Sequence, residues 1–180
     1  MRFVRAHSFE IRGRVLELDP SRLAEKLGCP TVLDRISTNP DDDSVTILAD
    51  PGEQGFVASD KYECVVMGTS WIREERPRDV LANMWAGVAD GGRLLVAVPT
   101  RSASTGGPLS DELPRHSSGF HRYLTEVCPK SEIRIVGFGN ADVSSAQRFG
   151  LSIEDVPRGV RDNDDARAPS LLGACIEKGT

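Results

Sequence analysis

Residues 78 to 99 decide the fold, and they read Arg-Asp-Val-Leu-Ala-Asn-Met-Trp-Ala-Gly-Val-Ala-Asp-Gly-Gly-Arg-Leu-Leu-Val-Ala-Val-Pro. The apolar residues of the first half recur at helical spacing, which predicts an amphipathic helix over 78–89 with Pro77 at its start. Gly91 and Gly92 are expected to end this helix. Residues 93–98 then form the most apolar strand of the chain, stopped by Pro99. A strand without a polar face is typical of a parallel sheet covered on both sides.

The rest of the chain repeats this alternation of strands and helices. Further strands are expected at 14–18, 31–33, 45–48, 62–67, 132–138 and 171–176, and further helices at 21–27, 120–127 and 141–149. Alternating elements of this kind predict an α/β fold. The expected architecture is a doubly wound, mostly parallel seven-stranded sheet with a trimmed N-terminal helix layer.

A chain of 180 residues is long enough for one core, so we expect a single domain over 1–180. Within it, residues 1–11 form an N-terminal extension. Residues 100–116 are rich in Ser, Gly and Pro, which predicts a surface loop or lid. Residues 157–169 form a polar loop.

Composition excludes several classes of function. Lys and Arg number 22 and Asp and Glu 27, so the net charge is −5, and no basic run could follow a phosphate backbone. Nucleic acid is therefore not expected as a partner. No apolar run is long enough to span a membrane, and no targeting segment is evident, which predicts a cytoplasmic protein. The four cysteines are far apart and without a C-x-x-C pair, and three of them lie in or beside apolar runs, which indicates buried, reduced thiols.

Acidic residues follow the expected strands. Glu17 and Asp19 come after the first strand, Asp34 after the second and Asp50 after the third. In an open parallel sheet, ligands bind outside the carboxyl ends of the strands. Carboxylates at that edge can accept hydrogen bonds from ribose hydroxyls or an adenine amino group. A pyrophosphate would instead need a glycine-rich loop, and the chain has none after its first strand.

Four segments together carry a family resemblance, and they are residues 14–19, 46–50, 61–67 and 88–99. In this order they resemble the class I S-adenosylmethionine-dependent methyltransferases, whose L-x-P-G-G-x-L element is similar to Val88 to Leu94 with Asp90 in place of proline. Residues 139–151 resemble a small bacterial branch with a shortened first-strand loop, found beside natural-product genes. The similarity runs from about Arg12 to about Lys178.

The resemblance implies a Rossmann-like methyltransferase fold with S-adenosylmethionine as the cofactor. It assigns cofactor contacts to Glu17, Asp19, Asp34, Ala49, Asp50, Met67, Gly68 and Thr69. The first two would face the methionine part or the ribose, and Asp34 the ribose hydroxyls. Ala49 and Asp50 would border the adenine, and the last three would lie under the sulfonium.

His116 and His121 are the candidate catalytic residues. The donor already carries an activated methyl group, so the enzyme chiefly aligns the reactants and excludes water. A base is needed only for an unactivated hydroxyl or a protonated amine. Both histidines flank the junction between the expected loop and the following helix, near the expected acceptor pocket. The alternative is that they are ordinary surface residues.

Several residues depart from the family pattern or have simpler explanations. Residues 18–22 (Leu-Asp-Pro-Ser-Arg) lack the glycines that usually follow the first strand, so a Cβ would stand near the amino-acid end of the cofactor. The simpler explanation for Glu17 or Asp19 is that the carboxylate caps the next helix and has no contact with a ligand. Asp50 begins a Pro-Gly turn sequence. The acidic triplet at 41–43 is expected to be a solvated turn, and no metal site is expected.

Two main hypotheses follow. The first is methyl transfer to an oxygen or nitrogen of a small natural-product or sugar-derived acceptor. The second is a non-catalytic binding or scaffold protein of the same fold that has lost cofactor use. A third keeps the pocket for lyase or cyclase chemistry, which no residue specifically favours. The expected partners are the small acceptor and either a second copy of the chain or a neighbouring biosynthetic enzyme, with no nucleic acid and no membrane.

Overall fold

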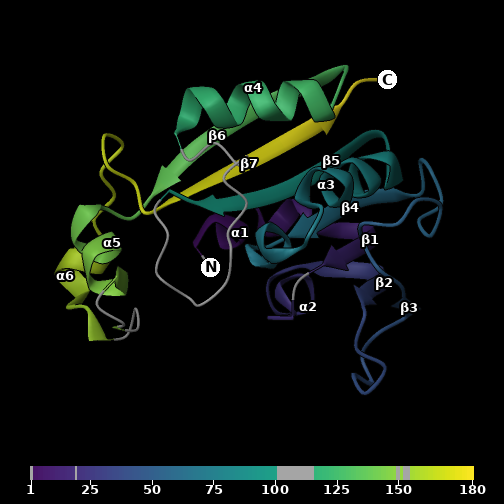
Figure 1. Ribbon diagram of the computed structural model, residues 1–180, viewed down its shortest axis with the longest axis horizontal. Coiled ribbons are helices and arrows are strands. Elements are labelled where there is room, and N and C mark those ends of the chain that lie inside the picture. The colour runs from purple at the N-terminus through teal and green to yellow at the C-terminus, as the bar shows by residue number, and fades with distance from the viewer. Residues whose placement is uncertain (1, 19, 101–115, 149–150, 152–154) are drawn as a thin grey trace.

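The computed structural model describes residues 2–18, 20–100, 116–148, 151 and 155–180 (Figure 1). Asp19 and most of the expected loop or lid at 100–116 lie outside the described residues. The side chains of residues 147 and 148 are likewise not described.

The sheet has seven strands in the order β3-β2-β1-β4-β5-β7-β6. They are β1 (Arg12–Leu18), β2 (Cys29–Ser37), β3 (Ile47–Leu48), β4 (Tyr62–Met67), β5 (Val88–Pro99), β6 (Ser131–Phe138) and β7 (Leu171–Lys178). All neighbours are parallel except β7, which is antiparallel to both β5 and β6. In Figure 1 the arrow of β7 points opposite to those of β5 and β6. The expected mostly parallel seven-stranded sheet is confirmed.

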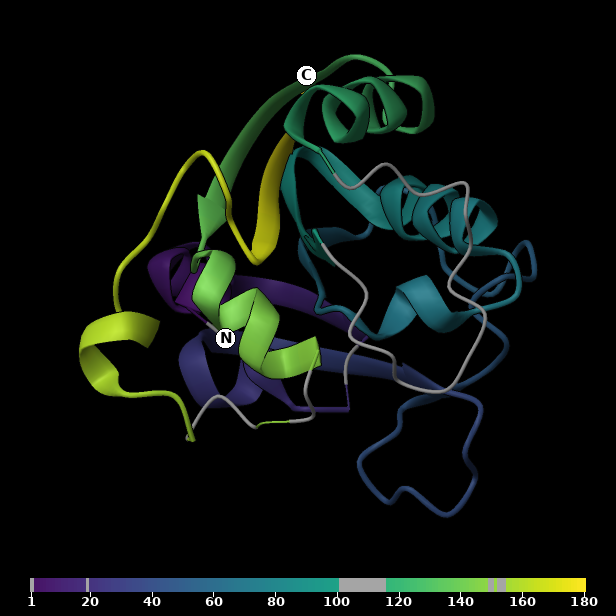
Figure 2. The same ribbon diagram turned by 60° about the vertical axis from the view of Figure 1, so that its left-hand side comes forward.

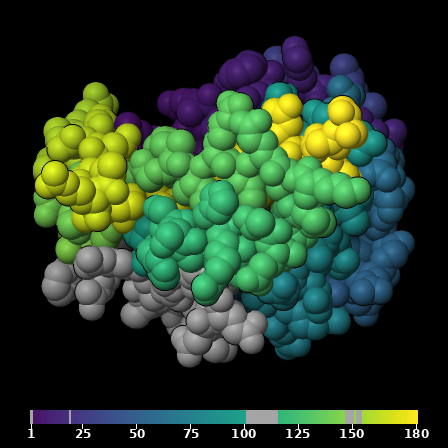
Figure 3. Space-filling model, turned by 90° about the horizontal axis from the view of Figure 1, so that it is seen from above, coloured from purple at the N-terminus to yellow at the C-terminus, as the bar shows by residue number. Residues whose placement is uncertain are grey.

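Helices cover both faces of this sheet. They are α1 (Arg2–Ala6), η1 (Ser8–Glu10), α2 (Leu23–Leu27), η2 (Ser70–Arg73), α3 (Pro77–Gly87), α4 (Ser117–Val127), α5 (Ala141–Arg148) and α6 (Arg158–Arg161). The chain of α4 and β6, green in Figure 3, forms the middle of the surface seen from above. Among the described helices, none has the length and apolar character needed to cross a bilayer.

The core forms two apolar layers because successive strand side chains point to opposite faces. Leu16 and Leu18 of β1 contribute to the layer under η2, α3 and α4, whereas Val15 contributes to the layer under α1 and α2. Both layers are fully buried at their centres. This double burial is why the central strands read as continuous apolar runs.

The two apolar layers contain Cys64, Cys128 and Cys175. Cys29, at the start of β2, is exposed, so the expected burial of the cysteines is wrong for Cys29.

The helix before β5 ends earlier than the sequence indicates. Helix α3 stops at Gly87, and β5 begins at Val88, so Gly91 and Gly92 belong to the strand span and do not end the helix. Here the pairing of β4 with β5 shifts register between Tyr62 and Cys64. A Cβ on Gly92 would lie 2.8 Å from the Ala89 carbonyl oxygen, so only glycine allows this close backbone approach.

The N-terminal residues pack against the sheet. Phe3, Val4 and Ile11 are fully buried in the layer shared with α2. The Phe3 ring lies 5.0 Å from the His7 ring and 5.9 Å from the Phe138 ring, measured between centroids. Residues 2–11, the described part of the expected extension, therefore cover part of one sheet face.

Strand β2 runs past its expected end at Leu33. It continues to Ser37, so Asp34 lies inside the strand, directly opposite Leu16 of β1. The expectation that Asp34 stands at a strand end is wrong. A carboxylate is tolerated inside β2 because three side chains donate to it.

Those three donors hold the Asp34 carboxylate on the sheet. Tyr62 Oη lies 2.9 Å, an Arg14 guanidinium nitrogen 3.1 Å and Lys61 Nζ 3.4 Å from the same Asp34 oxygen. Burial acts to raise the pKa of Asp34, but the hydrogen bonds and the positive charge of Lys61 outweigh it and lower the pKa. The ribose contact expected of Asp34 stays a prediction. The carboxylate is already bound by three side chains, which argues against that contact.

The packing of α1 on β7 can be tested with Gly173→Ala. A Cβ on Gly173 would overlap the Phe3 ring, so the variant should displace α1 and lower the free energy of unfolding by about 1–3 kcal/mol. Denaturant unfolding measures the loss. In a Phe3→Ala background the same substitution should cost much less, because the overlapping ring is gone. Equal losses in both backgrounds would contradict the packing.

The Asp34 cluster makes a pH-dependent contribution to stability. Its lowered pKa means that this stability is present above the ordinary carboxyl pKa near 3.8 and is lost as pH falls through the folded-state pKa. We expect Asp34→Asn to destabilise the fold by about 1–3 kcal/mol at neutral pH, with the difference from wild type shrinking below pH 3.8. Urea unfolding across pH measures it, with exposed Asp43→Asn as the control. A difference that does not depend on pH would refute this role.

Candidate functional site

A hollow of about 210 Å³ lies at the carboxyl ends of β1 and β2, beside the segment that follows β4 and next to the β1–β4 boundary where the strand order reverses. This is where open α/β sheets bind ligands. The strand ends that form it face the end of the molecule brought forward in Figure 2. We call it the first hollow. It is lined by Glu17, Leu18, Pro20, Arg22, Arg35, Ile36, Ser37, Thr38, Asp42, Ser44, Val45, Pro51, Ser70 and Glu74.

Glu17 lines the first hollow, and its carboxylate has partners within the chain. The side chain is buried; one oxygen accepts a 2.8 Å hydrogen bond from the Ala24 amide in the first turn of α2. The other lies 3.2 Å from Arg35 Nε, because Glu17 and Arg35 are paired in the β1–β2 register. Arg35 also reaches Glu25 at 2.6 Å. Glu17 thus caps α2 and forms a buried ion pair.

The end of β2 contributes hydroxyl groups that the sequence analysis did not single out. Ser37 and Thr38 both line the first hollow, at the position expected for Asp34. The sequence did contain a sign that the strand continues past Asp34 to these hydroxyl groups. Ile36 follows Asp34 by two residues and is buried, so the apolar alternation continues through the acid.

Ala49 and Asp50 follow β3, beside the first hollow but outside its lining. The Asp50 carboxylate accepts a 2.7 Å hydrogen bond from the Gly52 amide, which closes the Pro-Gly turn. It also lies 3.3 Å from Arg76. Neighbouring Pro51 does line the hollow.

Glu74, an acid that lines the first hollow, has a raised pKa. Burial is the main cause, and the negative charge of Asp50 adds to it. Arg22, in a left-handed conformation with φ 53°, lines the same hollow and lies 3.6 Å from Asp42. The described lining therefore combines two guanidinium groups with three carboxylates.

A larger hollow of about 580 Å³ lies beyond the ends of β4, β5 and β6. We call it the second hollow. It is lined by Arg2, Arg5, Thr69, Pro99, Phe138, Gly139, Val143, Arg161, Asp162, Ser170 and Leu171. Of the three residues expected near the sulfonium, Thr69 lines this hollow, whereas Met67 and Gly68 are buried. Thr69 and Ser70 are consecutive and line different hollows, so the turn after β4 borders both.

The two candidate catalytic histidines line neither of these hollows. His116 precedes α4 as its N-cap residue, and His121 lies in the second turn of the helix; both are exposed. His121 Nδ1 lies 3.5 Å from the Thr125 hydroxyl. Their role as bases stays a prediction. The contact expected of Asp19 lies outside the described residues.

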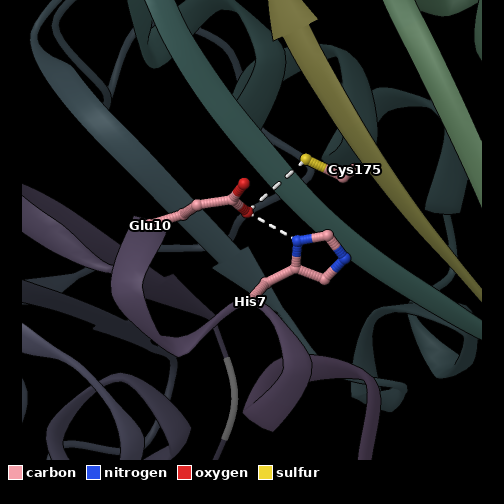
Figure 4. A group of neighbouring side chains, drawn as sticks. All are labelled: His7, Glu10 and Cys175. Atoms are coloured by element: carbon pink, nitrogen blue, oxygen red, sulfur yellow. Dashed lines mark hydrogen bonds and ion pairs between the residues drawn. The ribbon is translucent and has the colours of Figure 1, made fainter.

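His7, Glu10 and Cys175 bring metal-ligating atoms together, all within 4.8 Å of one another (Figure 4). One Glu10 oxygen lies 2.6 Å from His7 Nδ1 and 3.8 Å from Cys175 Sγ. Burial first, and then the charge of Glu10, raise the pKa of the Cys175 thiol to about 12. A metal would have to displace that proton. The contacts tie the N-terminal segment to β7, and the expected lack of a metal site stays a prediction.

Comparison with known proteins gives matches in structure only. No family model matches the chain, and no curated protein matches its sequence. A chain from the Haloferax volcanii complex between the Trm112 methyltransferase activator and a candidate methyltransferase superposes with a TM-score of 0.66 and 11% identity. The alignment covers 99% of this chain and 88% of that one.

Two further solved structures are similar over nearly the whole chain. An S-adenosylmethionine-dependent methyltransferase from Mesorhizobium loti has a TM-score of 0.59 and 15% identity, covering 97% of this chain and 95% of that one. The [4+2]-cyclase SpnF has a TM-score of 0.62 and 10% identity, covering 98% and 79%. The chain has the Rossmann-like fold of the class I S-adenosylmethionine-dependent methyltransferases.

Proposed function

We propose that the chain binds S-adenosylmethionine in the first hollow and transfers its methyl group to an oxygen or nitrogen of a small acceptor. The observation that carries the proposal is the hollow at the carboxyl ends of β1 and β2, beside the segment that follows β4 and next to the point where the strand order reverses. Proteins with an open parallel sheet bind their ligands near that point, because several strand ends and loops converge there. The resemblance in sequence and the fold support the same cofactor.

The donor set of the first hollow suits the parts of this cofactor. Arg22 and Arg35 offer cations for its carboxylate, and Glu17 offers an anion for its ammonium. Ser37 and Thr38 supply hydroxyls at the end of β2, where they would bind the ribose. Ile36, Val45 and Pro51 supply an apolar wall for the adenine. Small-molecule sites usually measure about 300–1,000 Å³, so the hollow of about 210 Å³ suits the nucleoside part best.

When bound, S-adenosylmethionine supplies an activated methyl group. The task of the chain is then to hold the acceptor in line with that group and to exclude water. The turn Thr69–Ser70 borders both hollows, so the chain would align donor and acceptor across it. A cytoplasmic location and a natural-product acceptor remain part of the proposal.

A second function is favoured by one observation. The Glu17 carboxylate already holds Arg35 and the Ala24 amide, and the loop after β1 has no glycine to admit the amino-acid end of the cofactor. A binding or scaffold protein that has lost cofactor use would have these features. It would keep its fold and ignore S-adenosylmethionine, and would be recovered from cells with a neighbouring enzyme.

Thr38→Val tests the proposed ribose contact. Loss of one hydroxyl should weaken binding of S-adenosylhomocysteine, the demethylated product, by about 0.5–1.5 kcal/mol, or roughly two- to tenfold. Isothermal titration calorimetry measures it. Thr31→Val, on the same strand but at its exposed amino-terminal half, is the matched control and should bind like wild type.

The titration also decides between the two functions. Folded wild-type protein that gives no heat with millimolar S-adenosylhomocysteine or S-adenosylmethionine would exclude cofactor binding and favour the scaffold. If the Thr38→Val variant binds S-adenosylhomocysteine as tightly as wild type, the proposed ribose contact at the end of β2 is wrong.

A further inference from the structure

The second hollow is a cationic cavity on an acidic chain. Its described lining holds three guanidinium groups, from Arg2, Arg5 and Arg161, and one carboxylate, from Asp162. The whole chain carries a net charge of −5. Like charges gathered in a hollow repel one another and attract an ion of opposite sign. The charge of this lining therefore favours an anionic occupant.

The three arginines come from opposite ends of the chain. Arg2 and Arg5 lie one turn apart on α1, so they share a helix face. Arg161 is the last residue of α6. Burial of Phe3 in the layer below fixes the position of α1 against the sheet. The fold therefore gathers these cations in one place, which the sequence alone does not indicate.

Internal partners neutralise these cations only in part. Asp164 lies 2.8 Å from Arg2, and Arg161 Nε is 3.8 Å from Asp162, whose side chain is largely exposed. Within the described part of the chain, Arg5 has no hydrogen bond and no ion pair. A guanidinium group binds a carboxylate or phosphate with two parallel hydrogen bonds. Arg5 is thus the donor that is open to a ligand.

The rest of the lining suits an apolar body. Phe138, Val143 and Leu171 line the hollow together with the ends of β4 and β5. At about 580 Å³ the hollow lies within the usual size range for small-molecule sites, roughly 300–1,000 Å³. It also borders the Thr69–Ser70 turn opposite the first hollow.

We propose that the second hollow binds the methyl acceptor, and that this acceptor is a small molecule with an apolar body and a carboxylate or phosphate group. Arg5 and Arg161 hold the anionic group, and the apolar side chains hold the body. The acceptor role rests on the proposed function, because it needs a methyl donor in the first hollow.

Three probes of similar size separate charge from shape: phenylacetate, phenyl phosphate and uncharged phenylacetamide. We expect at least one anionic probe to bind the full chain about tenfold more tightly than the amide, because charged groups strengthen hydrogen bonds. Ligand-observed NMR titration measures the affinities without any cofactor. Preference between the two anions tells a carboxylate acceptor from a phosphorylated one.

Arg5→Gln should weaken binding of the preferred anion about tenfold and leave the affinity for the amide unchanged. Arg161→Gln should act in the same direction. Arg12→Gln is the matched control, since it removes the same charge from an exposed site at the amino-terminal end of β1, and it should bind like wild type. Three outcomes would each overturn the proposed anion site. The three probes could bind with equal affinity, neither anion could bind, or the Arg5 and Arg12 variants could lose the same affinity for the anion.

The test separates this inference from the proposed function. Titration of the same proteins with S-adenosylhomocysteine should give equal affinities for wild type and Arg5→Gln. Cofactor binding without anion binding would refute the anionic acceptor and leave the methyltransferase proposal standing. Anion binding by a protein that ignores the cofactor would leave an anion site and remove both the methyltransferase proposal and the acceptor role.

Discussion

The parallel pairing of β1 with both β2 and β4 is the constraint on which the rest of the structure depends. It places Glu17 opposite Arg35 on one side and Leu18 opposite Met67 on the other. Because the strands run in one direction, their ends converge, and the loops that follow enclose the first hollow. A register shift of one residue would turn every side chain of β1 to the other face. The apolar layers above and below therefore fix the register and the site together.

The apolar runs made much of the fold predictable, and the failures have physical causes. Strand β4 was predicted with its observed bounds because its residues are buried on both faces. Strand β2 was predicted too short because Asp34 resembles a turn residue when seen alone. Its donors, Arg14, Lys61 and Tyr62, come from other strands or their ends, and no local pattern reveals them. Gly91 and Gly92, which lie within β5, were taken as a helix end for a similar reason. A Cβ on Gly92 would meet the carbonyl oxygens of Tyr62 and Glu63 on β4 as well as that of Ala89, and a local pattern does not show the contacts with β4.

The edge that carries the candidate site was easier to predict than the side chains that line its hollows. The rule for parallel sheets located the edge, and Glu17 does line the first hollow. The donors at the end of β2 were missed because they depend on where that strand ends. The cations of the second hollow were missed because α1 and α6 meet only after folding. Net charge describes the chain as a whole, and it says nothing about where three arginines gather.

The buried pair of Glu17 and Arg35 bears on whether the edge is a binding site. The Glu17 side chain is fully buried and that of Arg35 is 14% exposed. Desolvating such a pair generally costs as much as the attraction returns, so apolar residues there would serve stability equally well. The sheet carries other charged groups, such as the Asp34 cluster, but the buried Glu17 pair lies at the end of β1 where the first hollow opens. More charge lines the second hollow across the Thr69–Ser70 turn. The two proposed sites, one on each side of that turn, would give these charged groups a role in binding that their contribution to stability does not supply.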